Sequence, residues 1–182
     1  MLTPEFTKDF RQKTEAIWSS LTLRPDLYGF QFQRGTRWNS GLSGTELRSY
    51  ERALGFSFPS DLKVFLSEMN GTDLETVNVY GNCGEPMRRS VGVYAYPRDL
   101  AVVQTHVEAF NQNRAAIAAE LAEQGFNLSD ESSLLPFYEH RYVVCVPGSE
   151  STVVLSVLVS EVDAIVYADS LQAYLQREFL AD

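Results

Sequence analysis

The chain has 182 residues, of which 45% are hydrophobic and 21% charged, as is usual for a globular domain. No segment approaches the run of about 20 apolar residues that a membrane span needs, and the first residues lack the apolar core of a signal peptide. A membrane protein is therefore excluded, and we expect the cytoplasm. The net charge of −9 lies entirely in residues 105–182, which hold twelve acids and three arginines. Such a field disfavours nucleic acid and would steer a basic protein partner toward this part of the chain. Solubility of a small protein is the alternative role of these acids, and from the charge alone it is the simpler one.

The first predicted helix begins at Thr3-Pro4-Glu5, where a hydroxyl cap is followed by proline and an acid. The apolar residues spaced for its buried face are Phe6, Phe10, Ile17 and Leu21. After a break at Arg24-Pro25-Asp26, Phe30 and Phe32 alternate with glutamines, which predicts a short half-buried strand.

The most regular stretch of the sequence predicts two short helices joined by a tight corner. Ser43 and Glu46 form a capping box, in which each side chain satisfies a free backbone N–H at the helix start. Gly55 is placed to end this helix in a left-handed turn, and Pro59 suits the start of the next. Asn70-Gly71 then closes the pair.

The rest of the chain alternates strands with one long helix. Apolar spacing predicts helical structure from Asp99 to about Gln124, either as one long helix or as two broken near residues 111–113, and Arg114 fills one gap of the apolar stripe. A last helix is predicted to begin at a second capping box, made by Asp169 and Gln172. The predicted strands cover residues 76–80, 91–96, 142–146, 152–159 and 164–167.

The helical pair carries a recognisable signature. Its residues are Leu42, Ser43, Glu46, Leu47, Glu51, Leu54, Gly55, Phe58, Pro59, Leu62, Phe65, Leu66, Asn70 and Gly71. This pattern resembles the SUKH superfamily, which includes the fungal Smi/Knr cell-wall synthesis regulators and many bacterial toxin-immunity proteins. The resemblance covers about 42–80 and 135–180, whereas residues 85–131 look like a family-variable insertion that contains the long helix.

The resemblance implies one SUKH-like domain over residues 1–182 with an α+β fold. We expect a mixed or mainly antiparallel sheet of about five or six strands with helices packed on one side. It also implies a binding module rather than an enzyme, with no cofactor.

Catalytic motifs are not found in the sequence. The chain has two histidines, too few for a histidine-rich metal site, and we predict none. His106 lies one residue from the apolar stripe of the long helix and is expected to be exposed or at the edge of that stripe, and His140 is expected in a turn. Asp163 and Asp169 flank the last strand, and a carboxylate pair there would suit a small hydrolase. A turn residue and a helix cap explain these two acids more simply.

Four residues are candidates for contact with a partner. Asp73, Glu75 and Tyr80 follow the Asn-Gly pair and are expected beside an unpaired strand edge, where acids and an aromatic ring would suit a basic protein. An ordinary solvated loop is the alternative. Trp38 is a candidate surface anchor, although a ring just before a capped helix more often packs against it.

The leading hypothesis from the sequence is an immunity protein that binds and occludes a cognate toxin, for example a cationic nuclease. The alternative is a regulatory scaffold of the cell-wall synthesis type. We expect such a scaffold to carry long disordered tails. The sequence shows no tail of this kind, which favours the immunity hypothesis. A small hydrolase is a remote alternative, and the oligomeric state is left open.

Overall fold

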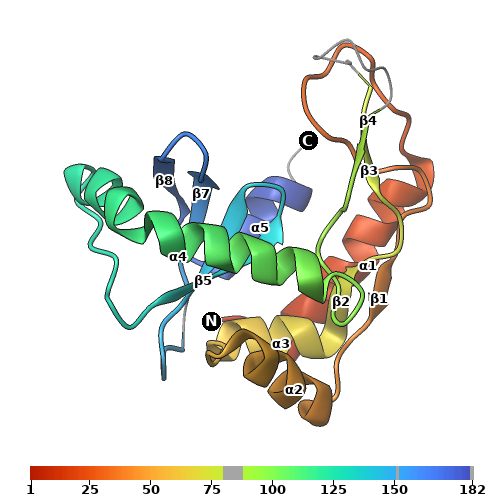
Figure 1. Cartoon of the computed structure of the whole chain (residues 1–182). Helices are drawn as coiled ribbons and strands as arrows, with labels where there is room; N and C mark the ends of the chain where they lie inside the picture. The colour runs from red at the N-terminus through yellow and green to blue at the C-terminus, as the bar shows by residue number, and fades with distance from the viewer. Residues whose placement is uncertain (80–87, 151, 181–182) are drawn as a thin grey trace.

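The computed structural model describes residues 1–79, 88–150 and 152–180. The helices are α1 (Pro4–Ser20), α2 (Gly44–Leu54), α3 (Ser60–Glu68), α4 (Leu100–Glu123) and α5 (Leu171–Phe179) (Figure 1). The strands are β1 (Trp38–Ser40), β2 (Met69–Thr72), β3 (Thr76–Asn78), β4 (Arg88–Ser90), β5 (Ser133–Tyr138), β6 (Arg141–Cys145), β7 (Val154–Leu158) and β8 (Asp163–Ala168). The predicted α+β class is confirmed. No helix of the described residues is long and apolar enough to cross a membrane.

The strands divide among three antiparallel sheets instead of one sheet of five or six. β5, β6, β7 and β8 form a four-stranded meander, while β1 pairs with β2 and β3 pairs with β4. The predicted strand at 91–96 does not form, because its backbone bonds go to two different neighbours. Val93 accepts a hydrogen bond from the Thr72 amide, and Tyr94 donates one to Phe137. The strand expected around residue 31 is reduced to one bridge with Val77.

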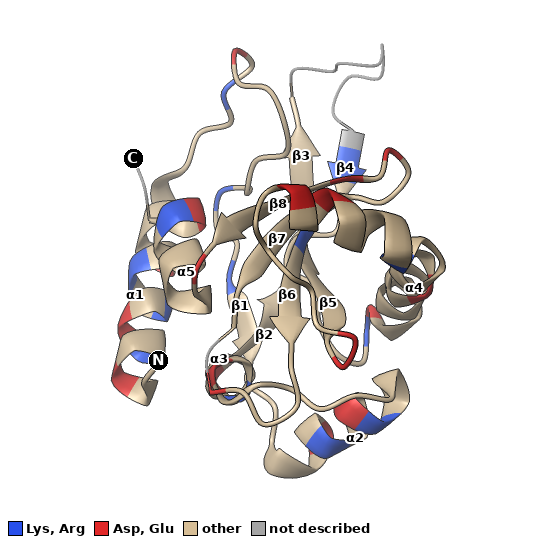
Figure 2. Cartoon of the chain, turned by 90° about the vertical axis from the view of Figure 1, so that its left-hand side faces the viewer, with Lys and Arg blue, Asp and Glu red and all other residues tan. Residues whose placement is uncertain are grey.

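Helices cover both faces of the four-stranded sheet, which corrects the expectation of helices on one side. Successive residues of a strand point to opposite faces, and both sets are apolar in β6 and β7. On one face, sheet residues such as Leu155 pack against Phe110 and Ile117 of α4. The opposite face packs against α1, α3 and α5. Figure 2 shows the strands between α4 on one side and α1 with α5 on the other.

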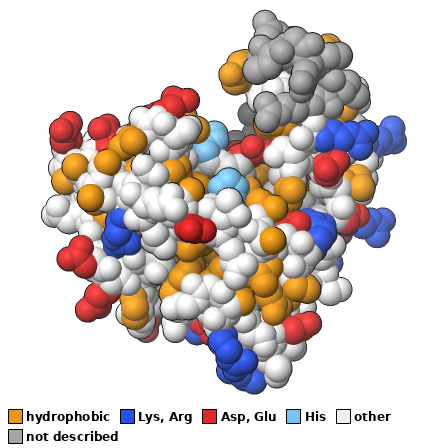
Figure 3. Space-filling view, in the orientation of Figure 1, with side chains coloured by type: hydrophobic (Ala, Val, Ile, Leu, Met, Phe, Trp, Pro, Cys, Tyr) orange, Lys and Arg blue, Asp and Glu red, His pale blue; other side chains and the backbone are white. Residues whose placement is uncertain are grey.

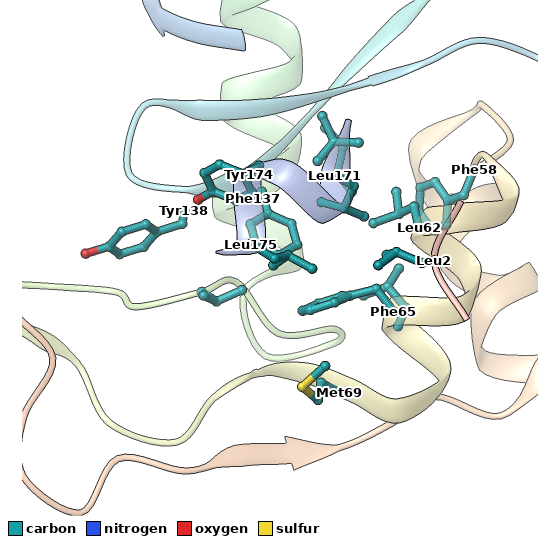
Figure 4. Packing of buried hydrophobic residues seen from close by; sticks show 14 of the residues in the cluster. Leu2, Phe58, Leu62, Phe65, Met69, Phe137, Tyr138, Leu171, Tyr174 and Leu175 are labelled. Carbon is teal, nitrogen blue, oxygen red and sulfur yellow. The ribbon is translucent and has the colours of Figure 1, made fainter. Parts of the chain in front are cut away.

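The larger core is rich in aromatic rings, which α1, α3, α5 and the sheet contribute (Figure 4). The Phe179 ring lies 5.8 Å from those of Phe10 and Trp38, measured between centroids. The Trp38 indole N–H donates to the Thr14 hydroxyl at 2.8 Å, so α1 turns Thr14 inward. Ile17, predicted on the buried face of this helix, is consequently 41% exposed.

The first helix of the signature begins and ends as the sequence predicts, whereas α3 ends at Glu68 and runs directly into β2, so Asn70-Gly71 do not close it. Ser43 and Glu46 form the capping box, and Gly55 ends α2 in the left-handed conformation at φ 81°. Asp61, in the first turn of α3, is fully buried and accepts the Leu2 amide at 2.8 Å. This bond ties the start of the chain to α3.

The cap of the last helix differs from the prediction. The Ser170 hydroxyl accepts the Ala173 amide at 3.1 Å and so caps α5. Asp169 precedes this cap and is exposed. The predicted cap was therefore wrong by one position, because the hydroxyl of a serine fits the same hydrogen-bonding role.

Asn70 and Gly71 lie in β2, where they hold the segment that leads into α4. The Asn70 side chain accepts the Tyr96 amide at 2.9 Å and donates to the Tyr96 carbonyl at 2.6 Å. Gly71 has φ +68°, and a Cβ on it would lie 2.6 Å from the Val93 carbonyl oxygen and 2.7 Å from the Ala95 Cβ. Only glycine fits this position, because both the backbone conformation and the space exclude a side chain.

We predict that Gly71→Ala destabilises the protein by about 3 kcal/mol or more, because left-handed strain adds to overpacking. Gly35→Ala is the matched control, since Gly35 has φ +83° but nothing within 4 Å of its Cβ position. That variant should lose about 1 kcal/mol. Urea unfolding measures both free energies, and equal losses would show that the close approach at Gly71 is not a constraint.

Candidate functional site

Both histidines of the chain meet in an open cleft of about 670 Å³ between α4 and the four-stranded sheet. Figure 3 shows the two imidazoles (pale blue) close together on one face of the molecule. The side chains that define the cleft are Tyr94, His106, Ala109, Glu139, His140 and Tyr142.

Three separate segments supply these side chains. His106 comes from the second turn of α4, and Tyr94 from the segment that Asn70 and Gly71 hold in place. The Tyr94 hydroxyl lies 3.2 Å from Nε2 of His106. Tyr142 belongs to β6, and its ring centroid is 6.5 Å from that of His106. The cleft is therefore built where the start of α4 crosses the end of the sheet.

Glu139 and His140 occupy the turn between β5 and β6. Glu139 adopts φ 50°, a left-handed conformation that is uncommon outside glycine and turns the chain back sharply. Its carboxylate accepts the Thr76 hydroxyl at 3.4 Å. The turn thus brings a carboxylate and an imidazole to one rim of the cleft.

Partial burial shifts the pKa values of the two histidines and the two tyrosines of the cleft in the direction that favours their neutral forms. It lowers the pKa of His106, since the charged imidazole loses water. For His140, burial and the nearby Arg141 lower the pKa against the opposing effects of Glu178 and Asp163. Burial raises the pKa of Tyr94 and of Tyr142 to about 12. At neutral pH both imidazoles are uncharged acceptors and both phenols keep their protons.

The predicted carboxylate pair does not meet. Asp163 begins β8 and Asp169 follows its end, so six residues of extended chain separate them by about 20 Å. Asp163 instead lies near enough to His140 to act on its pKa. Among residues 1–79, 88–150 and 152–180, no group of three or more metal-ligating side chains comes together.

Of the predicted partner-binding residues, two are exposed, one is buried and one lies outside the described residues. Asp73 and Glu75 are exposed and line a smaller cleft of about 260 Å³ beside Arg98. Trp38 is only 3% exposed, within the aromatic core, so its ring is not accessible to a partner. The Trp38 ring packs in the core, so it does not serve as a surface anchor. Tyr80 lies outside the described residues. The edge of β3 is occupied, by β4 on one side and by the bridge from Gln31 on the other.

Exposed carboxylates of the C-terminal half have no basic partners. They are Glu108, Glu123, Asp130, Glu131, Glu150, Glu161, Asp163 and Asp169. Within the described part of the chain, none of them forms an ion pair. Acids of the N-terminal half are often paired, as in Asp9 with Lys13 at 2.8 Å and Asp26 with Arg24 at 2.6 Å. Figure 3 shows acidic side chains gathered at the left, over the C-terminal end of α4.

Comparison with protein families decides the classification. Residues 41–177, well over half of the chain, match the model of the SMI1 / KNR4 family (SUKH-1). The chain belongs to this family. Members of the SUKH family are generally immunity or regulatory proteins without enzymatic activity. A comparison with curated proteins gives no match.

The histidine cleft was missed by the sequence analysis. His106 was placed correctly beside the apolar stripe of the long helix and His140 in a turn, but nothing predicted that they line one cleft. They are 34 positions apart, and only the packing of α4 on the sheet brings them together. No local pattern in the sequence carries that information.

We predict that both histidines titrate below the ordinary pKa of 6.5 in the folded protein. The unfolded chain then binds more protons as the pH falls through this value, so the free energy of unfolding decreases on acidification. NMR of the two imidazole ring signals gives the pKa values directly. Urea unfolding between about pH 7.5 and 5.5 tests the linkage, and the double variant His106→Gln/His140→Gln should flatten the dependence. Ring titrations at or above 6.5 would contradict the burial of these groups.

Proposed function

We propose that this SUKH protein is a non-enzymatic binding module, and most specifically an immunity protein that neutralises a basic toxin domain of the nuclease type. The family supports an immunity or regulatory role. The observation that selects a basic partner is the set of exposed carboxylates without ion pairs at the C-terminal end of α4 and around β8. Acids that served only solubility could be spread over the whole chain, whereas these are concentrated in its C-terminal half.

The proposed mechanism is occlusion assisted by electrostatic steering. Unpaired surface carboxylates raise the local concentration of a cationic partner and so increase the association rate. The helices packed on the rigid sheet then present a surface that covers the substrate-binding face of the toxin. No cofactor takes part, and we propose that neutralisation takes place in the cytoplasm.

A regulatory scaffold is the second candidate, because the family takes its name from the SMI1 and KNR4 group. The two candidates differ in what the bound partner loses. An immunity protein abolishes the toxic activity of one partner at a one-to-one ratio, whereas a scaffold leaves its partners active.

Growth protection tests the proposal. Expression of the chain together with the toxin domain encoded beside it should restore growth of a sensitive cell. An unrelated acidic protein of similar charge should not. Failure to protect, with both proteins present in the cytoplasm, would exclude the immunity role.

We predict that neutralising the acidic end slows association with the toxin. The variant Glu123→Gln/Asp130→Asn/Glu131→Gln should reduce the association rate about threefold to tenfold at low ionic strength, with less effect at high salt. Glu5→Gln/Asp9→Asn/Asp26→Asn is the matched control, since it changes the net charge equally in the N-terminal half. Stopped-flow or surface-binding kinetics measure both. Equal slowing by the two variants would mean that only net charge matters.

A further inference from the structure

The histidine cleft has the chemistry of a receptor for an organic cation. A neutral imidazole offers one ring nitrogen as an acceptor, and a tyrosine oxygen accepts as well as donates. Here two imidazoles and two phenols face the same space, and the aromatic rings add faces that attract a cation. Glu139 lines the same cleft and adds a carboxylate to it.

The size of the cleft indicates a side chain rather than an ion. Its volume of about 670 Å³ is within the usual range of ligand pockets. A bare metal ion is disfavoured, since no three ligating groups come together among the described residues. An anion is disfavoured by the carboxylates and by the absence of any lysine or arginine among the side chains that line the cleft in the described chain.

We propose that this cleft receives an arginine or lysine side chain of the basic partner. The inference rests on the proposed function, because it names the place where that partner inserts a cationic residue. Ala109 of α4 lines the cleft, and the inserted side chain would pass it. The two tyrosines and two histidines would surround the charged end of that side chain.

Binding of a cation is coupled to the protonation of the cleft. His106 contacts Tyr94 and lies near the Tyr142 ring, the charges of Arg141, Glu178 and Asp163 act on the pKa of His140, and Glu139 lines the same cleft. Protonated imidazoles would repel the guest, so a bound cation must lower the pKa of both histidines further, and acid must weaken binding. This reciprocity gives a readout that a purely structural cleft would not show.

A small probe tests the cleft without the partner. The probe is N-acetyl-arginine methylamide, and the control is its neutral isostere N-acetyl-citrulline methylamide. The chain has two histidines, so NMR yields two sets of ring signals that single His→Gln variants assign. We expect the arginine probe to shift both sets in a saturable way, with a dissociation constant on the order of 1 mM, and to lower both histidine pKa values. Equal shifts with the citrulline compound, or none with either, would overturn the proposal.

Matched variants of one helix locate the effect. Ala109→Leu should fill the cleft and weaken probe binding by about tenfold or more. Ala119→Leu makes the same change at an exposed position of α4 and should leave binding unchanged. Equal affinities in the two variants would place the probe elsewhere and overturn the proposal.

If growth protection succeeds while the probe does not bind, the docking site is wrong and the immunity role stands. If the probe binds and no toxin is neutralised, the cleft binds a cation as proposed and the immunity role is wrong.

Discussion

The close approach of two backbones at Gly71 is the constraint on which the rest of the arrangement depends. No Cβ fits between Gly71 and the Val93 carbonyl, and the Asn70 amide bonds both backbone groups of Tyr96. The segment held in this way hydrogen-bonds to β5 through Tyr94 and leads directly into α4. One short piece of the signature therefore sets where α4 lies over the sheet, and with it two walls of the histidine cleft.

The structure separates the residues that build the scaffold from those that face solvent. The capping box, the buried Asp61 and the aromatic cluster around Phe179 all serve packing or helix termination. Exposed carboxylates, in contrast, concentrate in the half of the chain that includes α4 and β8. Such a division suits a family in which a fixed fold presents variable binding surfaces, because changes on the surface leave the core bonds intact. Residues 85–131, the predicted insertion, provide α4 and thus part of that surface.

Local features of the fold were predictable from the sequence, and long-range ones were not. The Ser43 cap and the Gly55 terminator depend only on neighbours within a few residues, so their pattern predicted α2 correctly. Phe10 of α1 is buried as predicted, but Ile17 is exposed, because Thr14 turns inward to accept the Trp38 indole, a contact across the fold. Helices on both sheet faces and the meeting of the two histidines also depend on tertiary packing. The spacing of residues along the chain carries no information about this packing.

Hydrogen exchange of the chain, alone and bound to the proposed toxin partner, is the most direct test of which residues form the binding surface. The account predicts that binding protects the amides around the histidine cleft, the C-terminal end of α4 and the turn between β7 and β8. Amides of α2 and β1, which serve the scaffold, should exchange at unchanged rates. Protection centred on α2 and β1, with none at the cleft or along α4, would contradict the division between scaffold and binding surface.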